Sequence, residues 1–370
     1  MSHTAANGMA TTDIKLVTWN VDGINEVERI RRAKRACDEI LAMNPDVVSL
    51  QEVVAIDDME RVFDTAFGEN YMKVCPGGET MAYFTVTYIK KCWASGAISR
   101  RDHFEGAATS MMGRDMLCMT CNIKGIPLLV VNTHLESMKE SSETRTAQLK
   151  TITRLMLQHE GPAMVGGDLN MRDREQKDAF LNAGGADDAM TDAYFFFNRP
   201  ADARVTWELP DTPQAKGRFD RIYHNRKGIE FIHNIVMLGK QTIQGVGVRP
   251  SDHLGLVCSL RVQTPGGVSA SASTPASIAA PAPVHQASKP TTDNSAQASP
   301  SKKRSQPQPE SGSSPPPLEA EVLRLKRLRR FDSTKEEQVK PKTEPVFPAF
   351  LSAPSPSTAA EPCVEVIDLT

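Results

Sequence analysis

The 370-residue chain carries a formal net charge of −2 at neutral pH, so its overall charge excludes a uniformly basic nucleic-acid-binding protein and a strongly acidic one. No apolar run reaches the roughly 20 residues that a membrane-spanning helix needs, so we expect no membrane partner. The odd number of cysteines, seven, and their spacing predict free thiols rather than a zinc or disulfide framework.

Proline content divides the chain into a domain and a tail. Between Pro265 and Pro362 lie 17 of the 25 prolines, and this stretch contains no Trp or Tyr. Such a segment buries too little apolar surface to offset the entropy of ordering it. We therefore predict a disordered N-terminus over 1–12, one catalytic α/β domain over 13–262 and a disordered Pro/Ser-rich tail over 263–370.

The domain begins with two apolar runs, "IKLVTWN" at 14–20 and "PDVVSLQE" at 45–52. The segment 26–43 between them has apolar residues at helical spacing. A second helical pattern at 142–159 follows the run "IPLLVVNTHLES" at 126–137. This alternation predicts a layered α/β architecture.

The remaining predicted strands are 162–170, 218–224 and 251–260. Most of the predicted strands carry apolar residues on both faces, which is typical of sheets buried on both sides. Cys118 and Cys121 lie three apart in another strand pattern, so we expect them to face opposite sides of a sheet without forming a redox or metal pair.

Polar side chains gather where these predicted strands begin or end. Alternate residues of a strand share a face, so Asp168 and Asn170 would project together. Each such residue taken alone fits a turn, but their repetition at successive strand ends indicates a site at one rim of the sheet. The residues concerned are Asn20, Glu52, Asn132, His134, Asp168, Asn170, Asp252 and His253.

The segments "TWN", "LQE", "NTHLES", "GGDLN" and "SDH", in this order, resemble the endonuclease/exonuclease/phosphatase superfamily. The resemblance covers 14–262 and implies a four-layered α/β sandwich, with two packed mixed β-sheets flanked by helices. It also implies hydrolysis of phosphoesters with a divalent metal ion, Mg²⁺, for which Mn²⁺ could substitute.

Further segments resemble one branch of this superfamily, whose members hydrolyse 5′-phosphotyrosyl bonds. These segments are "NMRDRE", "TWE", "GRFDRIY" and "RPSDHLGL". The branch implies a repair hydrolase that releases trapped topoisomerase II from DNA 5′ ends and leaves a 5′-phosphate. It also allows protein–RNA tyrosyl links as substrates.

The resemblance assigns catalytic roles residue by residue. Glu52 is the expected direct metal ligand, Asp252 orients its neighbours or supports the metal, and Asn20 orients phosphate or metal-bound water. Asp168 and Asn170 position and activate the attacking water. The phosphate is expected to contact His134, Ser137 and His253.

Four residues are expected to contact the rest of the substrate. By resemblance, Arg172 anchors the site or the phosphate and Trp207 forms an apolar wall. Arg114 faces the tyrosyl ring, and Tyr83 lies near the DNA path. Alternatives remain: Arg114 also fits a solvated surface arginine and Trp207 a core residue. Because the DNA end must thread to the metal as a single strand, and the chain outside the tail is slightly acidic, any basic DNA groove is expected to be local.

The chain ends in "CVEVIDLT", which resembles a SUMO-interacting motif. Val364, Val366 and Ile367 would add a strand to a sheet of SUMO, and Asp368 would meet its basic residues; a frayed terminus is the alternative. The basic clusters 302–304 and 324–330 fit nuclear import signals or DNA contacts. We expect a monomer in the nucleus, with the cytoplasm as a second compartment.

Two other functions fit the same residues. A relative acting on another phosphoester, such as abasic DNA or RNA, would keep the same catalytic acids. A non-catalytic adaptor recruited by SUMO would use the tail alone, but it would have no use for Glu52, Asp168 and His253 together.

Overall fold

The computed structural model describes residues 11–78, 83–183, 190–209 and 212–263 of the chain. The predicted SUMO-interacting residues Val364, Val366, Ile367 and Asp368, and both basic clusters of the tail, lie outside the described residues. Within them, no helix is long and apolar enough to cross a membrane.

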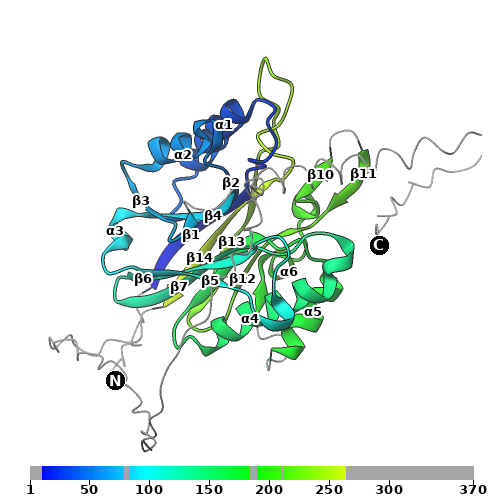
Figure 1. The fold of residues 1–370 in the computed structure, drawn as a ribbon. Coiled ribbons are helices and arrows are strands. Elements are labelled where there is room, and N and C mark those ends of the chain that lie inside the picture. The colour runs from blue at the N-terminus through cyan, green and yellow to red at the C-terminus, as the bar shows by residue number, and fades with distance from the viewer. Residues whose placement is uncertain (1–10, 79–82, 184–189, 210–211, 264–370) are drawn as a thin grey trace, which may run out of the picture.

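Two six-stranded mixed sheets form the centre of the molecule (Figure 1). The first has the order β13-β14-β1-β2-β4-β3 and the second β5-β6-β7-β8-β12-β9, and a separate hairpin pairs β10 with β11. The strands of the first sheet are β1 (Thr11–Asn20), β2 (Val47–Val53), β3 (Tyr71–Val74), β4 (Phe84–Lys90), β13 (Ile229–Leu238) and β14 (Gly255–Gln263). The other strands are β5 (Ile98–His103), β6 (Asp115–Ile123), β7 (Ile126–His134), β8 (Ala163–Asp168), β9 (Thr191–Asp192), β10 (Trp207–Leu209), β11 (Thr212–Gly217) and β12 (Asp220–His224).

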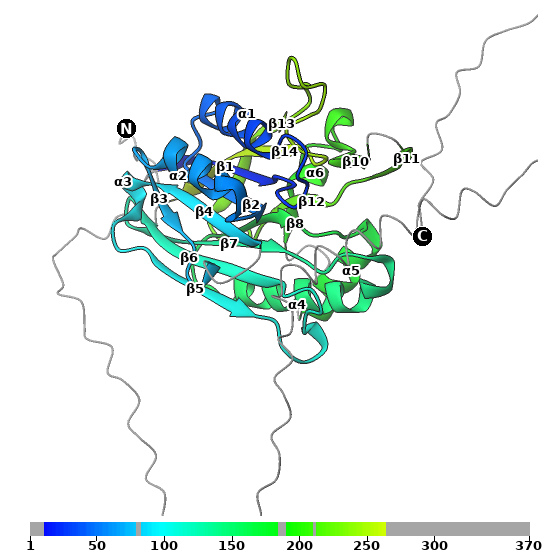
Figure 2. The same cartoon turned by 45° about the horizontal axis from the view of Figure 1, so that its top comes forward.

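Helices cover the outer faces of both sheets and complete four layers (Figure 2). The α-helices are α1 (Arg29–Ala42), α2 (Met59–Phe67), α3 (Lys91–Ala94), α4 (Ser142–Gln158), α5 (Asp173–Asn182) and α6 (Ala193–Phe196). The short 3₁₀ helices are η1 (Ile56–Asp58), η3 (Gly106–Ala108), η4 (Lys139–Ser141) and η5 (Ala201–Ala203). The predicted four-layered sandwich is confirmed.

Three apolar clusters hold the layers together. Leu16, Val130 and Met164 belong to the cluster between the two sheets. Helices α1 and α2 bury one face against the first sheet, and α4 and α5 bury theirs against the second. Cys121 joins the inter-sheet cluster and Cys118 the outer one, so the predicted opposite orientation of these free thiols is confirmed.

The domain extends slightly beyond its predicted limits of 13 and 262. β1 begins at Thr11, which pairs with Gln263 at the end of β14. The strand ladder therefore includes residues that the change in composition assigned to the N-terminus and to the tail.

The central strand pairs of both sheets are parallel, which brings their carboxyl ends to one edge. Asn20 at the end of β1 is in register with Gln51 of β2, and His134 at the end of β7 is in register with Asp168 of β8. β1 packs on β8 across the core. The close approach favours glycine in β8: a Cβ on Gly166 would lie 3.1 Å from the Cβ of Thr18 on β1.

Candidate active site

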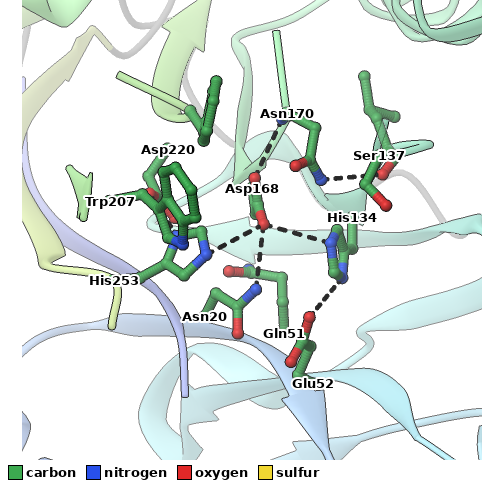
Figure 3. A network of polar contacts seen from close by, with 12 residues as sticks. Asn20, Gln51, Glu52, His134, Ser137, Asp168, Asn170, Trp207, Asp220 and His253 are labelled. Atoms are coloured by element: carbon green, nitrogen blue, oxygen red, sulfur yellow. Dashed lines mark hydrogen bonds and ion pairs between the residues drawn. The ribbon is translucent and has the colours of Figure 1, made fainter. Parts of the chain in front are cut away.

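Asp168 lies at the centre of the strand-end cluster and is almost completely buried (Figure 3). Its Oδ2 accepts a hydrogen bond from Asn20 Nδ2 at 3.0 Å and lies 3.2 Å from His134 Nε2 and 3.6 Å from His253 Nε2. Burial raises the pKa of Asp168, but the two histidines and the hydrogen bonds outweigh it and hold that pKa well below its usual range. Asp168 is therefore a fixed anion that four groups orient.

Asn170 reaches this cluster in a different way from the one predicted. β8 ends at Asp168, and Asn170 follows it with a left-handed φ of 50°, so the two residues do not share a strand face. The main-chain N–H of Asn170 instead donates to Asp168 Oδ1 at 3.0 Å, and its side-chain amide donates to the carbonyl of Leu135 at 3.2 Å. The expectation of a common strand face was wrong because Asn tolerates the left-handed turn that the chain makes here.

His134 is held between Asp168 and the guanidinium of Arg114. Arg114 Nη1 lies 2.8 Å from His134 Nδ1, and because a guanidinium can only donate, Nδ1 must accept. The proton of a neutral His134 then sits on Nε2, which faces Asp168 at 3.2 Å. Arg114 thus fixes the tautomer in which His134 donates toward the centre of the site.

His253 contacts Asp168 from the other side and is anchored by Asp220. Its Nδ1 lies 2.8 Å from Asp220 Oδ2. Burial lowers the pKa of His253, but Asp220 and Asp168 outweigh it and raise that pKa well above its ordinary value. His253 is therefore an imidazolium cation next to the Asp168 carboxylate.

Glu52 points toward His134 because β2 is irregular at its end. The pairing of β2 with β4 shifts register between Leu50 and Val53, and Glu52 in between has a left-handed φ of 57°. A bulge re-aims a side chain, and a left-handed non-glycine residue costs on the order of 1–3 kcal/mol. The result is a half-buried carboxylate whose Oε1 lies 3.9 Å from His134 Nδ1.

The carboxylates of Glu52 and Asp252, the two residues expected to bind the metal, act electrostatically on the buried carboxyl of Asp22. Burial and the charges of Asp252 and Glu52 raise the pKa of Asp22 to about 7, against the opposing effect of Arg32. Such mutual repulsion fits a divalent cation, because a hard metal ion prefers carboxylate oxygens and would relieve it.

A second group of possible donors consists of Asp168, Asp220 and His253, whose ligand atoms lie within 4.8 Å of one another. The Nδ1 of His253 already bonds Asp220, and Asp168 is held by Asn20 and Asn170. Asp22 also has a partner, Arg32 at 3.3 Å, so it is the mutual repulsion of Asp22, Glu52 and Asp252 that favours this group for a metal.

The residues predicted to contact substrate flank the cluster. Arg114 is buried rather than solvated, and its guanidinium carbon lies 5.2 Å from the ring centroid of Tyr83. Both line a small hollow together with Glu52 and His134. Ser137 is half-buried beside Asn170 (Figure 3). Within the described residues, its hydroxyl donates one hydrogen bond, to the weak acceptor Met112 Sδ at 3.1 Å.

Of the two remaining predicted residues, Trp207 lies beside His253 in the cluster (Figure 3). Trp207 of β10 donates its indole N–H to Asp252 Oδ2 at 3.0 Å, and its ring centroid lies 6.4 Å from that of His253. Trp207 is half-buried, which fits a wall of the site better than a core position. Arg172 precedes α5, where its main-chain N–H donates to Glu175 at 2.7 Å.

Two buried acids of the cluster were not among the predicted site residues. Asp22 follows Asn20 by two positions, but β1 ends at Asn20 and Asp22 has a left-handed φ of 47°, so strand alternation does not extend to it. Asp220 opens β12 and pairs in register with Asp168, but that pairing comes from the fold. Asp220 lies in the segment "GRFDRIY", but nothing in that segment indicates that it pairs with Asp168.

The model of the Endonuclease/Exonuclease/phosphatase family matches residues 17–253. Tyrosyl-DNA phosphodiesterase 2 from Homo sapiens is 30% identical to this chain over 258 residues, which covers 67% of this chain and 68% of the human protein. The protein of the same name from Gallus gallus is 31% identical over 265 residues, with 68% of each chain covered.

Solved structures agree with these sequence matches. The crystal structure of TDP2 from C. elegans superposes with a TM-score of 0.56 and 25% identity, over 68% of this chain and 75% of that one. D. rerio TDP2 complexed with a single-strand DNA product shares the fold at a TM-score of 0.58 and 24% identity, over 67% of this chain and 99% of that one.

Proposed function

The chain belongs to the Endonuclease/Exonuclease/phosphatase family of enzymes, and within that family we propose that it hydrolyses the 5′-phosphotyrosyl bond that joins a DNA end to a protein. The observation that carries the proposal is the convergence of Asn20, His134 and Asp168, from three strand ends, with His253, from the segment before β14. The names of the relatives at about 30% identity support the bond that is cut.

The cluster has the groups that an in-line attack on a phosphodiester needs. The fixed anion Asp168 can accept a hydrogen bond from a water molecule and so orient a lone pair of the water oxygen toward phosphorus. Its lowered pKa makes it an orienting acceptor rather than a strong base. The imidazolium of His253 and the N–H of His134 stand on either side to stabilise the charge that develops on the phosphate oxygens.

The proposed leaving group makes a strong general acid unnecessary. A tyrosine phenol has a pKa of about 10 and departs more easily than a sugar alkoxide. Arg114 and Tyr83, in the hollow next to His134 and Glu52, would face the departing ring, with a cation–π contact from Arg114.

We assign Mg²⁺ as the cofactor, with Mn²⁺ as its substitute. Glu52 and Asp252, with Asp22, would hold it. When bound, the ion would supply charge neutralisation on the phosphate. Asn20, which donates to Asp168, would orient that carboxylate. Ser137 would donate to a phosphate oxygen, and Arg172 would anchor the next phosphate.

The physiological substrate we propose is topoisomerase II trapped on a DNA 5′ end, released to leave a 5′-phosphate for repair. The entering strand would be single, as in the DNA complex of the D. rerio protein. We propose that the tail directs the enzyme to the nucleus through its basic clusters and to SUMO through Val364–Asp368.

The test is Mg²⁺-dependent release of tyrosine from a 5′-phosphotyrosyl single-stranded oligonucleotide. Turnover that is lost with EDTA and in Glu52→Ala is the expected result. An abasic duplex is the matched alternative substrate. Cleavage of the abasic duplex without tyrosine release would instead place the chain elsewhere in the family.

A further inference from the structure

A buried acid behind the site, Glu136, holds the segment Ser110–Arg114 in place. Ser110 Oγ donates to Glu136 Oε2, and the main-chain N–H of Met111 donates to Glu136 Oε1 at 3.1 Å. Glu136 is 1% exposed. Both of its carboxylate oxygens are thus committed to this one segment.

The contact continues from Ser110 to Arg114. Ser110 Oγ accepts the main-chain N–H of Met112 at 3.1 Å and that of Arg114 at 2.8 Å. The hydroxyl of Ser110 thus donates one hydrogen bond, to Glu136, and accepts two, which is the most that a hydroxyl can form. The conformation of Arg114 therefore depends on a carboxylate at position 136.

Glu136 is itself fixed to α4. Its main-chain N–H donates to Gln148 Oε1 at 2.9 Å, and its carbonyl accepts from Arg145 Nη1 at 3.1 Å. Gln148 and Arg145 are buried on α4. The segment is thus anchored to a helix that packs against the second sheet.

Arg114 has one buried donor to spare. Its Nη1 bonds His134, while its Nε has no hydrogen-bond partner among the described residues. A buried N–H without a partner destabilises the protein, because it has lost its hydrogen bonds to water. Arg114 lines the hollow together with Glu52 and Tyr83, so an oxygen atom that arrives there would meet its guanidinium.

We propose that Glu136 is a positioning residue for departure of the leaving phenol. Through Ser110 it holds Arg114 so that the guanidinium fixes the tautomer of His134 and offers Nε to the phenolate oxygen that forms as the P–O bond breaks. This inference rests on the proposed function, because it assumes an aryl leaving group.

Two substrates with the same oligonucleotide sequence test the proposed role of Glu136. One carries a 5′-phosphotyrosyl group and the other a 5′-(4-nitrophenyl)phosphate group. The nitrophenolate leaves without help, whereas tyrosine, with a phenol pKa of about 10, needs it. Glu136→Gln keeps the shape but offers a single acceptor oxygen, so we expect kcat to fall about tenfold on the tyrosyl substrate and less than about threefold on the nitrophenyl one.

Ser110→Ala is the second variant, because it removes the same link from a half-buried position and should change the ratio of rates in the same direction. Met111→Ala is the matched control: its side chain is 78% exposed and only its main chain contacts Glu136, so both rates should stay at the wild-type value.

An independent readout is the ¹⁵N shift of the His134 imidazole. In the wild type, Nδ1 should have the shift of an unprotonated acceptor, and Glu136→Gln should move it as Arg114 is released. Equal slowing of both substrates with an unchanged His134 spectrum would overturn the inference and leave the proposed function standing. A wild type that cleaves neither substrate would overturn both.

Discussion

Asp168 and Asp220 are cross-strand neighbours in the antiparallel pairing of β8 with β12, and the two carboxylates have opposite properties. The pKa of Asp168 is lowered, while burial raises that of Asp220. The imidazole of His253 contacts both of them. One carboxylate is thus kept as the anion facing substrate, and the other anchors the cation beside it.

The first prediction concerns the pH dependence of the reaction in Asp220→Asn. The groups facing His253 are Asp220, Asp168 and Asp252, and all three raise its pKa. Activity that needs the imidazolium is present below that pKa and lost as pH rises through it. Removing the charge of Asp220 should move this loss to lower pH, and kcat at neutral pH should fall about tenfold or more.

The measurement is kcat/KM against pH for the wild type and the variant. Asp202→Asn is a suitable control, because Asp202 is an exposed acid that pairs with Lys240. An alkaline limb that stays at the same pH in Asp220→Asn would show that the charge on His253 is not needed.

The second prediction separates water orientation from metal binding. Asp168→Asn keeps the size of the side chain but removes the anion that accepts from Asn20 and His134. Turnover should fall by at least about 10²-fold, while Mg²⁺ affinity measured by calorimetry changes little. Near wild-type turnover would remove Asp168 from its role.

The third prediction concerns metal removal. Repulsion among Asp22, Glu52 and Asp252 weakens the apo protein, so Mg²⁺ should raise its Tm and EDTA should reverse the rise. Asp22→Asn should raise the Tm of the apo protein and weaken the response to Mg²⁺. A Tm that does not respond to Mg²⁺ in the wild type would place the metal elsewhere.

The strand-end residues could be predicted from sequence because one physical rule governs them. Parallel central strands put their carboxyl ends at one edge, so Asn20, His134 and Asp168 had to meet once their strands were identified. Family resemblance added the expected role of Glu52 as a metal ligand. The orientation of its side chain depends on a bulge that periodicity does not reveal.

The remaining features depend on contacts between distant segments. Asp220 acquires its role from the register of β12 on β8, and Arg114 is buried because Glu136, 22 positions later in the printed sequence, holds its segment. Neither contact leaves a periodic signal. Asn170 shows the converse, because it does contact Asp168, but not through the strand geometry from which it was predicted.

The fourth prediction tests the tail. Val366→Ala combined with Ile367→Ala removes the apolar side chains that would enter a groove beside the SUMO sheet. SUMO binding in a pull-down should be lost while tyrosine release is unchanged. Glu361→Ala, outside the apolar run, is the control, and unchanged SUMO affinity in the double variant would retire the motif.

The fifth prediction concerns stability rather than catalysis, and its source is His224 at the far end of β12. The residue is 3% exposed, its Nδ1 accepts the main-chain N–H of Arg226 at 3.0 Å, and its ring lies 4.7 Å from that of Phe231. Burial, with a smaller effect of Arg226, lowers its pKa to about 4. The folded protein therefore keeps this imidazole neutral, while the unfolded chain protonates it near pH 6.5.

Because the unfolded state binds the proton first, this residue lowers the free energy of unfolding as pH falls from about 6.5 to about 4, by about 3 kcal/mol in total. Urea denaturation at pH 7 and pH 4.5 should show a smaller loss of stability in His224→Gln than in the wild type. His233→Gln, an exposed histidine on β13, should behave like the wild type at both pH values. If His224→Gln loses as much stability as the wild type on acidification, the buried imidazole must accept its proton without unfolding.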